Sequence, residues 1–264
     1  MGKALYVKKE TILLLSGYTF SLFGTGMSEP YLTLYLHQLR GLPLPFIGAI
    51  IGLSGLAGTL AIPLSGYLID RLDENRVFLA ALFVSAFGRI SFAEAINGEL
   101  ATLATMLSGM GAAALWNALS VILAKSVTQD YGDKIFGLAF TLQNLGSGLG
   151  AACGGFLLAE PRLSSYQLLF FLDAATFLGF GLLSYPQLRR SLHTKRGTAQ
   201  RHSLSPAHCR PSMDIIIVVL SIGYFLISIA MTGITSYLAP QWVIHQVHGS
   251  TNLIGQAFLI NSLM

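Results

Sequence analysis

Charged residues are scarce in this sequence. Asp, Glu, Lys and Arg together make up 11% of its 264 residues, whereas a soluble domain carries about 25%. So low a content excludes a surface that faces water over most of its area. Hydrophobic residues account for 53% of the chain, so much of that surface must face lipid.

Cysteine is also scarce, and the signatures of several ligand classes are absent. Cys153 lies in an apolar segment and Cys209 in a polar one, which excludes a disulfide framework. No Gly-x-x-x-x-Gly-Lys-[Ser/Thr] occurs, so we expect no bound nucleotide. His193, His202 and His208 match no zinc-ligand spacing, so we expect no metal and no cofactor.

Long apolar segments dominate the chain instead. A helix needs about 20 apolar residues to cross the ~30 Å hydrocarbon core of a bilayer. Seven segments qualify and an eighth begins before the end: 11–36, 46–68, 77–96, 101–123, 135–158, 166–185, 213–237 and 253–264. We therefore predict an all-α polytopic protein embedded in the lipid bilayer, with its 28 glycines allowing close helix packing.

The basic residues predict the orientation of these spans. If the N-terminus is cytoplasmic, only Arg40 and Arg162 lie outside and Arg89 lies within a span. Thirteen then lie on the cytoplasmic side: Lys3, Lys8, Lys9, Arg71, Arg76, Lys125, Lys134, Arg189, Arg190, Lys195, Arg196, Arg201 and Arg210. This bias predicts a cytoplasmic N-terminus in a cell membrane. It also accounts for the net charge of +4 without a nucleic-acid partner.

The distribution of polar residues divides the chain into three parts. Residues 1–185 hold six spans, residues 186–212 form a polar, basic segment expected to be a cytoplasmic linker, and residues 213–264 begin a second bundle. A weak repeat agrees with this division, because three dipeptides of the first span and its surroundings recur in order: Tyr31-Leu32, His37-Gln38 and Ile47-Gly48 as Tyr237-Leu238, His245-Gln246 and Ile254-Gly255. Since the chain stops in an apolar segment, we expect a fragment or truncated product.

A charged turn separates the second span from the third. Gly66, Leu68, Asp70 and Arg71 resemble the signature of the major facilitator superfamily after its second span. The glycine and two basic residues that complete the signature are replaced by Asp73-Glu74-Asn75, although Arg76 supplies one cation. The resemblance implies a conformational latch that closes the cytoplasmic side. The alternative is an ordinary charged turn.

Glycines in the fifth span carry a second resemblance. Gly146, Gly150, Gly154 and Gly155 are similar to the fifth-helix signature of the superfamily's drug–proton antiporters, with Ala151 in place of a proline. Glycines four residues apart form a flat helix face for close packing. The resemblance makes this face the hinge on which a rocking bundle would pivot.

The fourth span conforms less well to the superfamily. Gly109 and Gly111 are present, but Thr105 occupies the position where the family often has an arginine. The resemblance nevertheless covers essentially the whole chain. It implies the N-terminal six-helix bundle of the major facilitator fold plus the first one to two helices of the second half.

This resemblance also implies a function. We expect a secondary active transporter of small molecules that works by alternating access, with proton-coupled efflux, and not an enzyme. Two alternatives remain open: a truncated membrane fragment that does not transport, and an uptake permease for a metabolite or sugar.

Polar side chains within the spans are the candidates for a substrate or proton cavity. Glu29 lies beside the helix-breaking Pro30, and desolvation would suit its carboxyl group to proton exchange. Its alternative role is an outer-end carboxylate that reaches headgroup water. Trp116, Asn117, Gln143 and Asn144 complete the predicted cavity, unless the amides make hydrogen bonds between helices instead.

Three further charges lie within spans. Arg89 and Glu94 are five residues apart, about 140° around a helix, so they are not expected to pair. The resemblance makes their span peripheral, so we expect packing or interfacial roles for both, and for Asp173 in the sixth span.

Two other protein classes fit less well. A seven-helix receptor would need an external N-terminus, against the charge bias. An intramembrane protease could use Ser54 of Gly52-Leu53-Ser54-Gly55, but His37 and His245 both fall in outer loops, away from a serine within the membrane.

Overall fold

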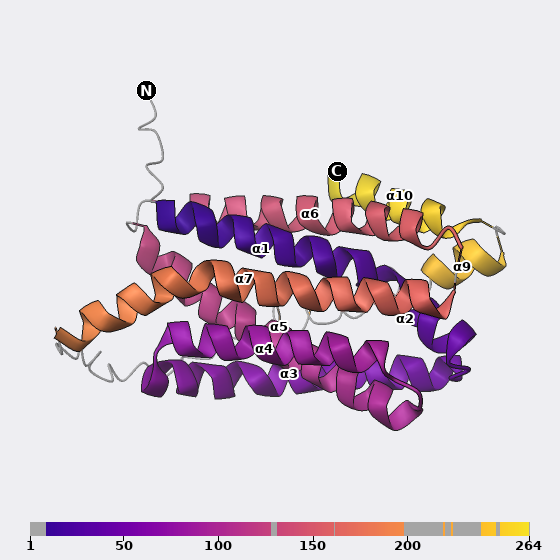
Figure 1. Cartoon of the computed structure of the whole chain (residues 1–264), viewed down its shortest axis with the longest axis horizontal. Helices are drawn as coiled ribbons and strands as arrows, with labels where there is room; N and C mark the ends of the chain where they lie inside the picture. Colours follow the sequence, from indigo (N-terminus) through magenta and orange to yellow (C-terminus); the bar gives the residue numbers. More distant parts are fainter. Residues whose placement is uncertain are drawn as a thin grey trace.

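The computed structural model describes residues 9–127, 131–160, 162–197, 219, 223, 239–246 and 249–263. Within these residues the regular structure is helical throughout (Figure 1). The predicted span at 213–237 lies outside the described residues apart from two single positions.

The first predicted span is a helix that breaks before its C-terminal end. α1 covers Lys9–Ser28 and gives way to a 3₁₀ turn, η1, at Glu29–Tyr31. Pro30 causes the break, because its ring has no N–H to donate and collides with the preceding helical turn. A short α2 (Leu32–Leu34) and a π-helical turn, η2 (Tyr35–Leu39), complete the span.

The next three spans are long, uninterrupted helices. α3 covers Leu44–Leu72, α4 covers Glu74–Ala93 and α5 covers Gly98–Ser126. α5 begins where the Asn97 side chain accepts a 2.9 Å hydrogen bond from the backbone N–H of Leu100, which satisfies one of the free donors at a helix start. These three helices are each long and apolar enough to cross a membrane.

The remaining helices complete the bundle. α6 covers Gly132–Leu157 and α7 covers Leu163–Gly197, of which Leu163–Pro186 is long and apolar enough to cross a membrane. α7 continues through Pro186 past the end of the bundle (Figure 1), so the segment expected to be a linker starts as a helix. α9 (Ala239–His245) and α10 (Thr251–Leu263) follow.

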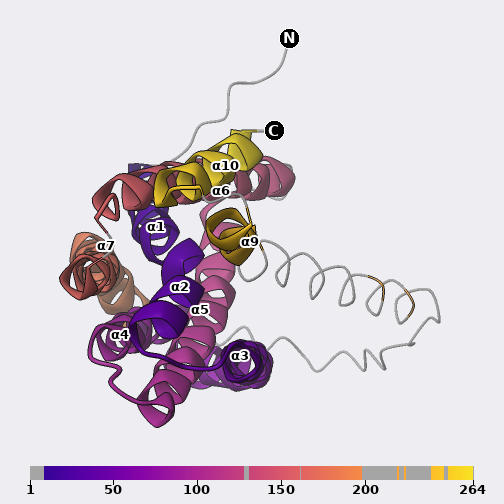
Figure 2. The same cartoon turned by 90° about the vertical axis from the view of Figure 1, so that its right-hand side faces the viewer.

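The helices form two packed groups joined by α7. α5 packs against α3 and α4, while α6 packs against α1 and α10, and α7 contacts both α4 and α1. Figure 2 shows α3 and α10 at opposite edges of this arrangement. Two apolar clusters fill the interior, one around Phe78 and Phe180 and the other around Tyr35 and Phe170. Within each, the aromatic centroids are 5.1 Å apart.

Glycines bring α1 and α6 into close contact. Three glycines of α6, each four residues from the next, lie directly against three backbone carbonyls of α1 with the same spacing: Gly146, Gly150 and Gly154 against Thr19, Phe23 and Met27. A Cβ atom at any of them would overlap the facing carbonyl. The fourth glycine of the motif, Gly155, faces the Tyr31 hydroxyl and the Thr251 carbonyl of α10. The motif is thus the contact surface of α6 on both sides.

Gly150→Ala is expected to lower the free energy of unfolding by about 1–3 kcal/mol, because the added methyl group meets a backbone carbonyl that cannot move alone. Gly137→Ala on the same helix is the matched control. A Cβ there has no neighbour within 4 Å, so the better helix propensity of alanine should leave stability equal or about 0.5–1 kcal/mol higher. Thermal melting in detergent measures both. Equal melting temperatures for the two variants would contradict the close contact.

Candidate transport site

A cavity of ≈ 520 Å³ lies between the two helix groups. Its wall is formed by residues of seven helices, α1 to α7, and of η1, so no single helix encloses it. The residues that line it are Tyr18, Ser21, Leu22, Thr25, Glu29, Leu32, Ile51, Ser54, Arg89, Phe92, Thr105, Ser108, Gly109, Ala112, Leu115, Trp116, Phe140, Gln143 and Phe177. The lining is mixed aromatic, aliphatic and polar, as in small-molecule sites.

Glu29 is placed on this wall by the break in α1. It is the first residue of η1 and is exposed in the structure, while its neighbours Ser28 and Pro30 are buried. Within the described part of the chain its side chain takes part in no hydrogen bond or ion pair. The cavity therefore contains a free carboxylate at its wall.

Trp116 and Gln143 line the cavity and both contact Tyr18. The Tyr18 hydroxyl donates a 2.7 Å hydrogen bond to the Gln143 Oε1 atom, and the Tyr18 and Trp116 rings are 5.8 Å apart. α1, α5 and α6 thus each contribute one polar or aromatic side chain to the same patch. The wall of this cavity thus contains an aromatic and amide patch as well as the carboxylate of Glu29.

The two asparagines of the predicted cavity are placed differently. Asn117 donates through Nδ2 to the Ser65 Oγ atom at 2.8 Å and to the Ile62 carbonyl at 3.2 Å, which ties α5 to α3. Neither Asn117 nor Asn144 belongs to the lining residues of this cavity. For Asn117 the structure favours the interhelical hydrogen bond, which was the alternative interpretation.

A buried ion pair connects α4 to α7 beside the cavity. The Arg89 Nε atom lies 3.0 Å from the Asp173 Oδ2 atom, and the Asp173 side chain is fully buried. Two hydroxyls of α1 donate to the same carboxylate, Ser28 at 2.5 Å and Thr25 at 3.3 Å. This ion pair is a packing role, as expected for Arg89, but the Arg89 side chain also lines the cavity, which was not expected.

Sequence reasoning missed this pair, although a signal was present. An unpaired charge within a span is energetically unfavourable, so an arginine and an aspartate in different spans are expected to form an ion pair. The resemblance argued against it, because it placed the third and sixth spans away from the cavity.

The charges of the turn after α3 have defined contacts in the structure. Asp70 is exposed and forms no ion pair among the described residues, and the Arg71 guanidinium lies 4.9 Å from the centre of the Tyr67 ring. Glu74 instead pairs with Lys125 at the end of α5, with 3.1 Å between nitrogen and oxygen. Among the described helices, the ion pair that fixes this turn is therefore formed by Glu74, which is not one of the four residues that match the signature.

The sequence matches the family model of the Major Facilitator Superfamily over residues 14–264. The chain belongs to this superfamily. It is therefore an integral membrane protein of a transporter family.

Similar proteins of known name lie within the same superfamily. The chain is 31% identical over 155 residues to "Multidrug resistance protein MdtG" of Proteus mirabilis, which covers 57% of this chain and 38% of that protein. It is 27% identical over 169 residues to the protein of the same name from Salmonella paratyphi B, covering 63% and 41%. The matches thus span about two fifths of the length of these relatives.

A solved structure shows the same fold. The crystal structure of a D-xylose-proton symporter matches with a TM-score of 0.60 at 14% identity, over 96% of this chain and 65% of that one. At this identity the similarity concerns the fold alone.

Asp73 stands where the superfamily signature has glycine, and the backbone there explains the family's preference. Its φ of 106° and ψ of 142° lie in a region that side chains with a Cβ rarely adopt. Such a conformation costs about 1–3 kcal/mol. The Asp73 carboxylate offsets part of this cost by capping α4, since its Oδ1 accepts a 2.9 Å hydrogen bond from the Asn75 N–H.

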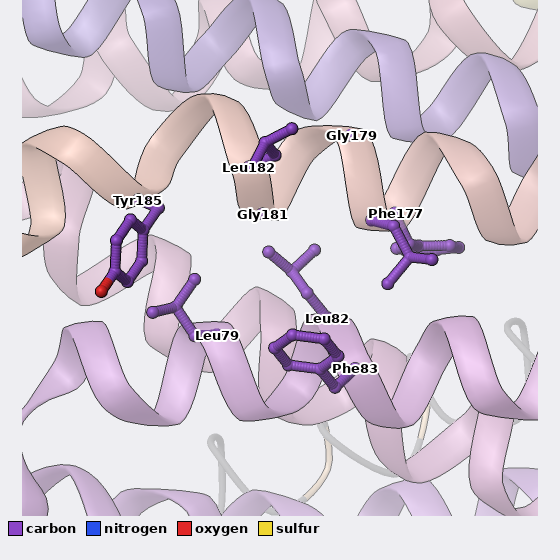
Figure 3. A pocket seen from close by; sticks show the side chains of 9 residues that line it. Leu79, Leu82, Phe83, Phe177, Gly179, Gly181, Leu182 and Tyr185 are labelled. Carbon is purple, nitrogen blue, oxygen red and sulfur yellow. The ribbon is translucent and has the colours of Figure 1, made fainter.

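A second hollow lies on the outside of the bundle and differs in chemistry. This groove of ≈ 450 Å³ between α4 and α7 is lined by Leu79, Leu82, Phe83, Phe177, Leu178, Gly179, Gly181, Leu182 and Tyr185. Figure 3 shows Leu79 and Leu82 pointing toward α7, and Tyr185 pointing back toward α4. None of these side chains carries a charge, so the groove suits hydrocarbon and offers nothing to fix the orientation of a polar substrate.

Asp73→Gly is expected to raise the free energy of unfolding by about 1 kcal/mol, because glycine adopts the backbone conformation without strain and loses little as a cap. Asp73→Ala is the matched control, since it keeps the strain and loses the cap; it should lower stability by about 1 kcal/mol. Thermal melting of both variants in detergent tests this. A glycine variant less stable than the alanine variant would contradict the strain.

Proposed function

We propose that this chain is part of a secondary active transporter that exports small organic molecules by alternating access, in exchange for protons. The observation that carries the proposal is the central cavity with the free carboxylate of Glu29 at its wall. A carboxylate that is accessible and unpaired can bind either a proton or a cationic substrate, which is the competition that an antiporter needs.

The lining supports a cationic, aromatic substrate. Trp116 and Tyr18 provide ring faces, and Phe92, Phe140 and Phe177 extend the aromatic surface. Cations bind over such faces, most strongly where water is displaced. The printed name of the two bacterial relatives, multidrug resistance protein, agrees with this substrate class.

The arrangement of the helices supports alternating access. The cavity lies between two helix groups, and the glycine surface of Gly146, Gly150 and Gly154 brings the backbone of α6 against that of α1. The turn after α3 would act as the latch, through Gly66, Leu68, Asp70, Arg71 and Arg76. The bias of basic residues predicts that this turn and the N-terminus both lie on the cytoplasmic side. Exposed Asp70 is free to pair with a partner that approaches during closure.

Transport is tested in liposomes containing the protein, with ethidium as a flat aromatic cation. Wild-type protein should move ethidium against its gradient when a pH gradient is imposed, and collapse of that gradient should stop the movement. Ethidium that never moves, or D-xylose that moves with protons instead, would contradict efflux. Movement of neither compound would support the alternative of a fragment that inserts without transporting.

Glu29→Gln is expected to abolish proton-driven ethidium flux over the whole pH series, because the amide binds neither a proton nor a cation. Glu99→Gln is the matched control, since Glu99 is an exposed glutamate in the first turn of α5 that does not line the cavity. Its flux should equal that of the wild type. Undiminished flux in Glu29→Gln would remove this residue from the mechanism.

A further inference from the structure

Glu29 and Arg89 are the two charged side chains among the residues that line the cavity. Arg89 pairs with Asp173, at a nitrogen–oxygen distance of 3.0 Å, and among the described residues it forms no ion pair with Glu29. The Arg89 side chain is only 9% exposed and lines the cavity. The cavity thus contains an anion and a cation that are not paired with each other, because the cation pairs with a third charge.

The Asp173 carboxyl group is contacted by one ion-pair partner and two hydroxyl donors, from two helices. Arg89 comes from α4, whereas Ser28 and Thr25 come from the last two turns of α1. The donor Ser28 directly precedes Glu29, so the network ends at the residue that carries the free carboxylate. Arg89 and Glu29 are the charged groups near Asp173, and the neighbouring wall of α5 presents Thr105 and Ser108, which carry no charge.

The contact with Arg89 depends on the charge of Asp173. A proton on the carboxylate removes the attraction for Arg89, and a guanidinium without a counter-ion is unfavourable in so enclosed a site. Arginine stays protonated at any pH that a protein meets, so the released side chain needs another anion. Glu29 is the anionic side chain among the residues that line this cavity.

We propose that Arg89 and Asp173 form a proton-operated switch: a proton taken up by Asp173 releases Arg89, which pairs with Glu29 and displaces a bound organic cation. The inference rests on the proposed function; it keeps Glu29 as the site of the cation and places the exchanged proton on Asp173. When the proton leaves Asp173, Arg89 returns to it and Glu29 is free to bind the next cation. One proton enters for each cation that leaves, so the total charge of the cavity is the same before and after the exchange.

The switch makes a prediction that competition at Glu29 alone does not. Arg89→Gln/Asp173→Asn removes both charges, so it leaves no unpaired ion in the interior and should fold. With Glu29 as the sole proton site, this double variant would lose ethidium affinity on acidification as steeply as the wild type. With the switch, wild-type affinity falls about tenfold per pH unit, and the double variant keeps its high affinity through the same pH range.

Equilibrium binding of ethidium to the purified protein in detergent distinguishes these outcomes, with thermal melting as the check on folding. Wild-type pH dependence in the folded double variant would overturn the switch. Arg89→Lys keeps the charge and should keep the pH dependence, whereas its loss in this variant would also count against the proposal.

Ser28→Ala provides a test that leaves every charge in place. Loss of the 2.5 Å hydrogen bond to Asp173 removes support for the carboxylate, so the pH dependence of binding should move to higher pH. Ser16→Ala is the matched control, because Ser16 is a serine of the same helix that does not line the cavity and whose hydroxyl donates to the Ile12 carbonyl. Identical pH profiles for the two variants would contradict the role of Asp173.

The two proposals fail in different ways. A protein that binds ethidium with the predicted pH response but never moves it across the membrane would refute transport and leave the switch standing. Proton-driven export by the wild type, together with an unchanged pH response in the double variant, would refute the switch alone.

Discussion

The ion pair between Arg89 and Asp173 is the constraint on which the placement of three helices depends. Burying either charge alone would be strongly unfavourable, by about 3–5 kcal/mol when one partner of such a pair is removed. α4 and α7 must therefore face each other at this level, and α1 must bring Ser28 and Thr25 to the same carboxylate. Along α4 and α7 the pair lies where the two apolar clusters meet, between Ala86 and Phe92 and between Phe170 and Phe177.

Close packing of α1 against α6 accompanies an open space between this pair and the second helix group. The glycines of α6 let α1 approach until backbone meets backbone, and van der Waals contact then holds two helices that lipid would solvate equally well. α5 packs against α3 and α4 in the second group. The cavity is the space between these groups, and the break at Pro30 turns Glu29 into it. Close helix packing and a charged cavity thus depend on a few residues of α1 and α6.

Much of the fold could be predicted from the sequence, because lipid imposes a simple rule on span length and composition. The described helices α1 to α7 overlap the first six predicted spans, and Pro30 marked the break in the first of them. The end of the sixth span could not be predicted, since α7 continues through Pro186 into polar residues. Nor did the sequence indicate that Asp73 would adopt a glycine-like backbone, although the family motif has glycine there.

The candidate site could be predicted less well, for a physical reason. Hydropathy gives the length of a span but not its rotation about its own axis. Glu29, Trp116 and Gln143 lie on the cavity wall, whereas Asn117 turns toward Ser65. Which charges meet across spans depends on those rotations, so Arg89 was assigned to the periphery while it lies beside Asp173.

Alternating exposure of the cavity is the central claim, and cysteine labelling tests it most directly. With Cys153 and Cys209 replaced by serine, Phe140→Cys places a single thiol on the cavity wall. Membrane-impermeant maleimide should label it from the cytoplasmic side in one condition and from the outside in another, as pH and ethidium shift the balance between the two states. Labelling from the same side under every condition would contradict the account.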